Sequence, residues 1–526
     1  MNEVVLSSLF NRCDGFAKEI YNMSSKQRFI TTPIFYANGQ PHLGHAYTGI
    51  IADIFHRFST LSGEQSRLIT GTDEHGQKIA TTAQASQLPT QTFIDQISET
   101  FRALWPQLNI VPDIFVRTTE NDHQQYIQTI WRKLQQQGDI YVGSYCGEYC
   151  VACEQYYPQR ELIDQNICPV HKQPVSHIEE ETYLFRLEKY RLRLLEYYQT
   201  NPNVIVPSHF QDNIIEQLKS GELDDLSISR VHNQWGIPVP DNASHTVYVW
   251  IDALFSYISA ILKAEATQEN IANTQHIIGK DILIFHAVYW PAFLMALDLP
   301  LPEKLLVHGW WTINGDKISK SNPATTVNPA SFAERLTQDG LRYALVRQKP
   351  LFRDGNVDLD EFAELLNADL LNNYANLVKR TNTLIVRYFA GHISPDSIGE
   401  LDDESIDVID LLSANLKLII HSYTAGNLFQ VVKEIHNALS QLNSFFHTRS
   451  PWLVNKGQPE QKAQQTCFIV STYLREITWL LSPITPTLCH NVLEEMGLPQ
   501  SSILNQKTNI FAEIEALSAN SHWVRI

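Results

Sequence analysis

The chain has no long hydrophobic run, few cysteines for its length and a deficit of positive charge. No uninterrupted apolar segment in its 526 residues approaches the ~18 residues of a membrane-spanning helix, so we expect no membrane partner. Its seven cysteines are too sparse for a secreted disulfide scaffold. A formal net charge of −17 argues against indiscriminate binding of nucleic acid. A local basic track, such as Lys379 and Arg380 with Arg387, remains compatible with this balance.

The first residues also lack the features of a targeting segment. They carry the acidic residues Glu3, Asp14 and Glu19, whereas mitochondrial presequences are poor in acids and secretory signals have a longer apolar core. We therefore expect an N-terminal extension over residues 1–24 and a cytoplasmic protein, with the mitochondrial matrix as the alternative compartment.

What the chain does contain is enough apolar sequence, 44% hydrophobic residues, for several domains. Phe29–Thr32 predicts a strand that stops at Pro33, and a helix is expected to begin near His42–Ala46. A second apolar strand, Arg67–Thr70, runs into polar residues. Strand, helix and strand with polar residues at the strand ends are typical of the βαβ unit of a doubly wound sheet, whose ligands lie beyond the carboxyl edge.

A nucleotide-binding pattern, His42, Leu43, Gly44 and His45, stands at the predicted helix start. The first N–H groups of a helix are unpaired and lie at its positive end, so they favour phosphate. The two imidazoles add N–H donors, and Gly44 permits close approach of a nucleotide. Alone, the pattern also occurs in small nucleotidyltransferases, and two histidines can stand at a helix start by chance. It predicts an ATP site with His42 and His45 as catalytic residues.

A second basic motif, Lys317–Ser321, follows a hairpin-like turn at Gly315. Lys317 and Lys320 on a mobile loop could close over a triphosphate and neutralise the charge that develops on pyrophosphate. A solvated basic turn is the plainer interpretation of these residues alone. Together with His42–His45 they favour adenylate chemistry, which depends on alignment and charge stabilisation rather than on a protein nucleophile.

Four metal-binding residue types form two close pairs in the middle of the chain. Cys150 and Cys153 make the first pair, Cys168 and His171 the second, and two residues separate the members of each pair. This spacing predicts a tetrahedral site for one Zn²⁺. Because all four positions are filled by protein ligands, the zinc is expected to be structural. Unliganded core thiols are the alternative.

Several blocks around these motifs carry a resemblance to a known family. They are Thr31–Thr48, Gly71–Gly76, Tyr248–Leu254, Gly279–Ile282, Phe285–His286 and Trp290–Pro291. Together they resemble the methionyl-tRNA synthetases, from about residue 28 onward. These are class I enzymes, whose HIGH signature corresponds to His42–His45 and whose KMSKS signature corresponds to Lys317–Ser321. The resemblance implies activation of L-methionine with ATP and Mg²⁺ to methionyl-adenylate and pyrophosphate. It also implies transfer of methionine to the 3′-terminal adenosine of initiator and elongator tRNA-Met.

The resemblance further implies two sets of ligand-binding residues. The methionine pocket would comprise Ile34, Tyr36, Asp73, Trp250, Ala253, Tyr257, Ile282, Phe285 and His286, and ATP would contact His42, Gly44, His45, Gly279, Asp281 and Lys320. An unbranched side chain with a polarizable sulfur suits aromatic walls and one polar tip. Asp73 is expected to pair with the α-ammonium group. Ordinary core packing is the alternative for Trp250 and Phe285.

The pattern of apolar residues from about residue 360 onward predicts successive amphipathic helices. Asn376 and Arg380 stand one turn apart on one helix face, and Pro451 begins a helix that presents Trp452. By the resemblance these three residues, Asn376, Arg380 and Trp452, read the CAU anticodon, in keeping with the way proteins stack unpaired RNA bases. A core anchor is the alternative for Trp452. No OB-fold module follows, so a monomer is expected.

Other synthetases fit less well. Isoleucyl, valyl and leucyl enzymes insert a large editing domain between the signatures, for which the segment from His45 to Lys317 is too short. A cysteinyl enzyme would disperse its zinc ligands. A non-catalytic RNA-binding relative is disfavoured because both signatures are intact.

We therefore expect an α/β fold, a Rossmann-type doubly wound parallel sheet with a zinc-knuckle insertion, followed by an all-α anticodon-binding bundle. The predicted boundaries are an N-terminal extension over 1–24, the first Rossmann half over 25–139, the connective insertion over 140–228, the second Rossmann half over 229–309, the KMSKS-loop and stem-contact region over 310–365 and the helical domain over 366–526.

Overall fold

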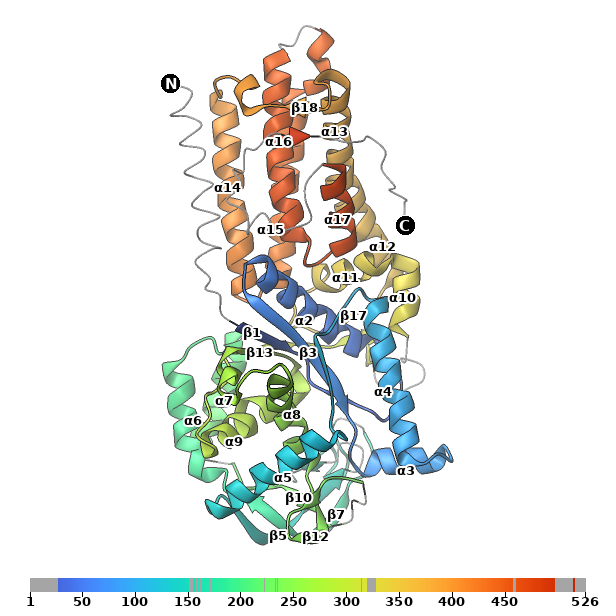
Figure 1. The fold of residues 1–526 in the computed structure, drawn as a ribbon, viewed down its shortest axis with the longest axis vertical. Coiled ribbons are helices and arrows are strands. Elements are labelled where there is room, and N and C mark those ends of the chain that lie inside the picture. The colour runs from blue at the N-terminus through green and yellow to red at the C-terminus, as the bar shows by residue number, and fades with distance from the viewer. Residues whose placement is uncertain are drawn as a thin grey trace.

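A parallel β-sheet occupies the middle of the molecule, and a column of long helices extends above it in Figure 1. The computed structural model describes residues 27–150, 155–157, 159, 162–169, 172–221, 223–231, 233, 235–313, 315–318, 328–456, 460–496 and 514–515. The predicted α/β class is confirmed. The domain boundaries stay predictions.

The main sheet is parallel throughout. Its strands are β1 (Gln27–Thr31), β2 (Phe35–Tyr36), β3 (Gln65–Asp73), β4 (Ile114–Arg117), β8 (Ile205–Val206), β13 (Thr274–Gly279) and β14 (Lys304–His308). They run in the order β4-β3-β1-β13-β14-β8, and the short β2 pairs with the end of β3. Because every pair is parallel, the carboxyl ends of β3, β13 and β14 meet at one edge.

Alternating residues of the strands face two separate hydrophobic cores, as the pleat requires. Ile30 and Ile277 belong to the first core, and their neighbours Phe29 and Ile278 belong to the second. Both faces are therefore covered, which explains the nearly continuous apolar character of these strands.

Helices from both halves of the chain cover the sheet. The first core receives α2 (Leu43–Leu61), α3 (Gln77–Ala85) and α4 (Thr90–Gln107). The second receives α5 (Asn121–Gln136), α6 (Glu188–Thr200), α7 (Ser208–Ser220), α8 (Val249–Lys263) and α9 (Trp290–Ala296). Helix α2 begins as predicted after His42 and stops before Gly63, whose φ of +83° suits the residue after a helix.

Two small antiparallel sheets lie below the main sheet in Figure 1. One contains β5 (Ile140–Cys150), β6 (Gln155–Tyr157), β7 (Ser176–Phe185) and β9 (Leu226–Ser227), and the other contains β10 (Ser229–Arg230), β11 (Pro238–Val239) and β12 (Asn242–Val247). Segment 140–228 is not only an insertion, because its β8 pairs with β14 in the main sheet. Strand β12 ends at Val247, and Val249 already begins α8.

The rest of the described chain contains a third small sheet, a helical region and a two-stranded antiparallel pair of β18 (His392–Ile393) and β19 (Ile514–Glu515). The sheet joins β15 (Trp311–Ile313), β16 (Asp316–Lys317) and β17 (Gly355–Asn356). The helices are α10 (Pro329–Leu336), α11 (Gln338–Arg347), α12 (Leu359–Leu366), the π-helix η5 (Asn367–Ala375), α13 (Asn376–Tyr388), α14 (Asp403–Thr424), α15 (Leu428–Arg449), the 3₁₀ helix η7 (Pro451–Lys456), α16 (Glu460–Leu481) and α17 (Pro486–Glu495).

The first core continues from the sheet into this helical region. Phe58 of α2 stacks on Tyr423 of α14 with ring centroids 4.2 Å apart. Bundle and sheet therefore share apolar packing. Within the described residues, no helix combines the length and the apolar character needed to cross a membrane.

Candidate active site

The start of α2 holds a stacked pair of histidine rings, His42 and His45, with centroids 3.7 Å apart. The backbone N–H of Gly44 donates to Nδ1 of His42 (3.1 Å), and the backbone N–H of His42 donates to Nδ1 of His45 (3.0 Å). Because each Nδ1 accepts, the proton of each neutral ring stands on Nε2. A Cβ at position 44 would lie 2.9 Å from Cε1 of His42, so the glycine also preserves this pair.

The carboxyl end of β3 carries a tightly held acidic loop. A Cβ at Gly71 would lie 2.2 Å from a carbonyl oxygen of β4, so only glycine fits there. Asp73 follows at the strand end and is largely buried. The next residue, Glu74, is fully buried and accepts hydrogen bonds from Arg117 Nε and Thr72 Oγ1, both at 2.7 Å. Asp73 is thereby fixed at the edge of the sheet where ligands bind in such folds.

A buried polar network ties this loop to α8. Asp252 accepts from Nδ1 of His75 (2.7 Å) and from Nε2 of His123 (2.6 Å), and Nδ1 of His123 lies 2.7 Å from Oγ of Ser259. Burial by itself raises the pKa of the Asp252 carboxyl, but the charges and hydrogen bonds of the two histidines prevail and leave that pKa below its ordinary value. An ionised Asp252 thus holds the Asp73 loop against the helix that bears Trp250.

Behind Trp250, the predicted methionine pocket ends in a neutral histidine. Nδ1 of His286 lies 3.0 Å from the carbonyl oxygen of Ile282, and Nε2 lies 2.8 Å from the hydroxyl of Tyr257. A carbonyl can only accept, so the ring proton is on Nδ1 and Tyr257 donates to Nε2. Burial lowers the pKa of His286 to about 4, which keeps the ring neutral near pH 7.

Aromatic rings form a wall beside this polar pair. Trp250 stacks on Phe285 with centroids 3.7 Å apart and an interplanar angle of 8°. Phe285 and His286 lie in η4 (Phe285–Tyr289), a π-helical turn that places successive side chains differently from an α-helix. The other predicted pocket residues are buried or half-buried at the same sheet edge or on α8, namely Ile34, Tyr36, Ala253 and Ile282.

The ends of β13 and β14 supply the other predicted nucleotide contacts. Gly279 is the last residue of β13 and pairs with His308 at the end of β14. A Cβ on Gly279 would lie 2.6 Å from Oδ1 of Asp281, which also accepts from Nε1 of Trp310 (3.2 Å). Nε2 of His308 lies 2.9 Å from Oγ1 of Thr48 in α2. The sheet edge and the histidine-bearing helix are therefore joined directly.

The second basic motif begins on the hairpin β15–β16. Gly315 makes the turn with φ +83°, and Lys317 ends β16. The side chain of Lys317 and all of Lys320 lie outside the described residues. A buried lysine missed in the sequence, Lys349, supports the hairpin. Its Nζ lies 4.8 Å from the ring centroids of both Tyr47 in α2 and Trp311 in β15, and burial lowers its pKa to about 7.

Comparison with known proteins settles the family. The family described as tRNA synthetases class I (M) matches residues 28–177 and 161–382. The chain belongs to this family.

The relatives of this class I synthetase include bacterial proteins of similar length. A methionine–tRNA ligase of Nostoc sp. is 36% identical over 500 residues, covering 93% of each chain. One from Rickettsia felis is 38% identical over 477 residues, covering 89% of this chain and 92% of the relative. The crystal structure of Mycobacterium tuberculosis methionyl-tRNA synthetase bound by methionyl-adenylate has a TM-score of 0.87 and 32% identity, covering 94% of this chain and 99% of that one. The resemblance inferred from the sequence is confirmed.

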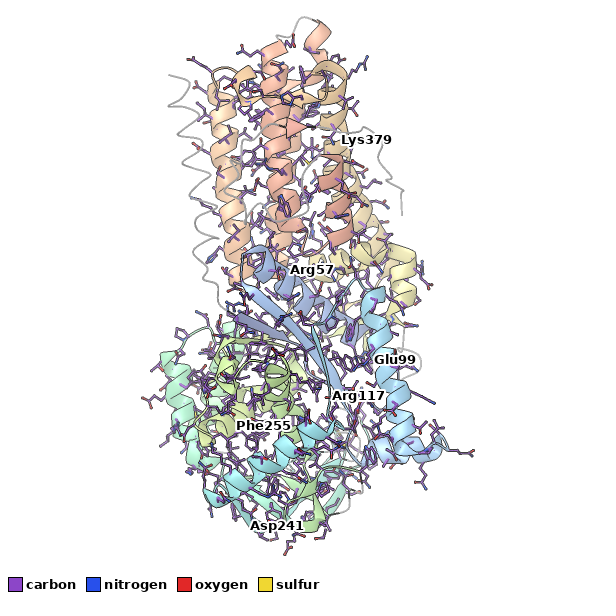
Figure 2. The ribbon with its side chains drawn as sticks, viewed as in Figure 1. Arg57, Glu99, Arg117, Asp241, Phe255 and Lys379 are labelled. Atoms are coloured by element: carbon purple, nitrogen blue, oxygen red, sulfur yellow. The ribbon has the colours of Figure 1, made fainter. Side chains whose placement is uncertain are left out.

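In this synthetase the three residues predicted to read the anticodon lie on neighbouring elements of the helical column. Asn376 is exposed at the start of α13, on the turn before Arg380. The guanidinium of Arg380 lies 4.8 Å from the ring centroid of Phe446 and 5.4 Å from that of Trp452. The neighbouring Lys379 is labelled in Figure 2, far along the column from the sheet. Trp452 is half-buried, so one part of its ring packs and another part is accessible.

Half of the predicted zinc set falls within the described residues. Cys150 and Cys168 lie in one small buried cluster with Tyr157, although they come from separate segments. Two buried thiols brought together in this way fit a soft-metal site. Cys153 and His171 lie outside the described residues, and no group of three metal-binding side chains occurs among those described.

Proposed function

We propose that this synthetase is a methionine–tRNA ligase, which activates L-methionine with ATP and transfers it to tRNA-Met. One observation carries the proposal. Trp250 stacks on Phe285, and Tyr257 donates to His286. Helix α8, which bears Trp250 and Tyr257, is tied to the Asp73 loop through the hydrogen bond between Asp252 and His75. A largely apolar aromatic wall with one neutral polar tip is complementary to a thioether side chain.

The first reaction step joins the methionine carboxylate to ATP. A carboxylate oxygen attacks the α-phosphorus, the bond to the bridging oxygen breaks, and its electron pair leaves with pyrophosphate. We assign Asp73 to the α-ammonium group, the Nε2–H groups of His42 and His45 at the positive end of α2 to the phosphates, and Asp281 to the nucleoside. Lys317 and Lys320 would neutralise the charge that develops on pyrophosphate, and Mg²⁺ would enter with ATP.

The second step transfers methionine to the 3′-terminal adenosine. A ribose hydroxyl attacks the carbonyl carbon of the adenylate, loses its proton and expels AMP. We assign recognition of the anticodon to Asn376, Arg380 and Trp452, because unpaired bases stack on aromatic rings and guanidinium planes while polar side chains hydrogen-bond their edges.

We also propose one structural Zn²⁺ held by Cys150, Cys153, Cys168 and His171. The buried pair Cys150 and Cys168 supports this assignment, and thiolate ligands would favour zinc over harder ions. In solution we expect a monomer. The bacterial sources of the relatives favour the cytoplasm as its compartment.

The amino-acid dependence of ATP–pyrophosphate exchange tests the proposed substrate. We expect rapid exchange with methionine and none with leucine, isoleucine or cysteine. Homocysteine lacks one methyl group, which is worth about 1–3 kcal/mol, so its kcat/KM should be roughly 10- to 200-fold lower. A preference for leucine or cysteine would refute the methionine assignment.

A matched pair of variants links the substrate preference to the pocket. Tyr257→Phe removes the hydroxyl that donates to His286 and should lower kcat/KM for methionine, whereas Tyr141→Phe removes a hydroxyl bound to Asp225, outside the pocket, and should change little. Equal effects of the two variants would place the methionine side chain elsewhere.

A further inference from the structure

Arg342, in the middle of α11, joins three separate parts of the molecule through one buried guanidinium. Its side chain has no exposed surface. Nη2 contacts Oδ2 of Asp53 in α2 (2.6 Å) and the carbonyl oxygen of Pro483 (2.8 Å), and Nε donates to the carbonyl oxygen of Ile484 (2.9 Å). Nη1 donates to the carbonyl oxygen of Leu108 at the end of α4 (3.3 Å). The fork of a guanidinium suits such simultaneous contacts, which lysine could not make.

On one side of Arg342 lies the helix that begins at the active site. Asp53 is buried in α2 and also accepts from Nε of Arg57 (2.6 Å), whose Nη2 donates to the carbonyl oxygen of Asn109 (2.7 Å). Arg57 is labelled in Figure 2 where α2 approaches the helical column. Asp53 lies about 16 Å along the helix axis from His42, at a rise of about 1.5 Å per residue. Arg342 therefore contacts α2 at a point remote from the histidine pair.

On the other side lies the turn between α16 and α17. Pro483 and Ile484 form this turn, and Oδ2 of Asp339, one turn before Arg342 in α11, accepts from the backbone N–H of Leu488 in α17 (2.6 Å). Helix α11 is therefore hydrogen-bonded both to this turn and to α17.

From this turn, α16 leads back to the surface assigned to the anticodon. It follows η7, which bears Trp452. The hydroxyl oxygen of Thr478 in α16 lies 2.7 Å from that of Tyr374. Tyr374 stands two residues before Asn376.

Stability alone does not explain this arrangement. A buried ion pair gains little over apolar side chains of similar volume, because desolvation offsets the attraction. Its value lies in fixing one geometry, since few orientations of the bundle satisfy all four acceptors of Arg342 at once.

We propose that Arg342 is a positioning residue that fixes the helical bundle against α2, so that a tRNA bound at the anticodon surface presents its acceptor end correctly to the adenylate. The inference rests on the proposed function. Loss of Arg342 should therefore impair tRNA charging but not adenylate formation. Helix α2 stays buried in the first core without Arg342, whereas the bundle loses the hydrogen bonds that fix its orientation.

The test compares Arg342→Met with Arg335→Met, a control at an exposed arginine of α10. Rates are expressed per active site, after titration of adenylate formed by the full chain. For Arg342→Met we expect methionine-dependent exchange within threefold of the wild type. We expect kcat for charging a CAU tRNA to fall about 30-fold, the effect of losing charged hydrogen bonds, with KM for tRNA changed less than threefold. The control should match the wild type in all three.

The dependence of charging on the anticodon provides a second measurement, which a general loss of stability would not change. The wild type should charge a CAU tRNA far faster than the same tRNA with an altered anticodon, and this ratio should shrink at least tenfold in Arg342→Met. Equal losses of exchange and charging, an effect on KM alone, or an unchanged ratio would each overturn the proposal. If Arg342→Met does not fold, Arg342→Lys keeps the charge near Asp53 but loses the fork, and the same outcomes apply. Failure of the proposed function would show separately, as absence of methionine-dependent exchange in the wild type.

Discussion

Replacing Asp252 by asparagine should damage methionine activation selectively. The Asp252 carboxylate accepts two buried hydrogen bonds, from His75 at 2.7 Å and His123 at 2.6 Å. An amide keeps only one acceptor oxygen, so one of these charged bonds is lost, at about 2 kcal/mol. Because the hydrogen bond of His75 to Asp252 holds the loop of Asp73 against α8, its loss should disturb the arrangement of the methionine pocket. We expect kcat/KM for methionine in ATP–pyrophosphate exchange to fall about 30-fold, with KM for ATP nearly unchanged.

A control at the far end of the same network sharpens this test. Ser259→Ala removes the hydroxyl near Nδ1 of His123 but leaves both contacts of Asp252, so it should stay within threefold of the wild type. Thermal melting of both variants separates unfolding from loss of the pocket. Full kcat/KM for methionine in Asp252→Asn, or a KM for ATP that rises as much as the KM for methionine, would show that Asp252 does not assemble the methionine pocket.

Three further outcomes are expected. Because burial lowers the pKa of His286 to about 4 from an ordinary 6.5, the neutral ring stabilises the fold fully above pH 6.5. This contribution to the free energy of unfolding, about 3 kcal/mol at most, is lost as pH falls through 4. His286→Gln should remove that part of the pH dependence of the unfolding free energy, and an unchanged pH dependence would contradict the neutral state of His286. Cys168→Ser should abolish binding of one Zn²⁺ per chain, measured by metal analysis, and lower the melting temperature, whereas Cys489→Ser, remote from the cluster, should retain the metal. Trp452→Ala should raise KM for tRNA roughly 5- to 150-fold, the worth of one stacked base, while exchange stays normal; an unchanged KM would make Trp452 a core anchor.

Local patterns sufficed for the part of the fold nearest the nucleotide site. The strand–helix–strand unit and the helix start at His42 follow from apolar periodicity, the stop at Pro33 and the loop before the helix. These signals are encoded within a few residues, so the sequence alone reveals them.

Contacts between distant segments could not be predicted in this way. His75 and Asp252 are 177 positions apart, and Asp53 and Arg342 are 289 apart. Periodicity indicates which side chains are buried, but not which buried partner each one meets. Likewise β8 is only two residues long, too short for a period-2 pattern, so its place in the main sheet emerges only from tertiary pairing.

The most direct test of the proposed activity is the charging of a purified CAU tRNA by the full chain with ATP and a panel of amino acids. We expect an ester of methionine at the 3′-terminal adenosine, formed with release of AMP and pyrophosphate, and no charging of the same tRNA by leucine or cysteine. Failure to charge this tRNA with methionine, or efficient charging with another amino acid, would rule out the proposed activity.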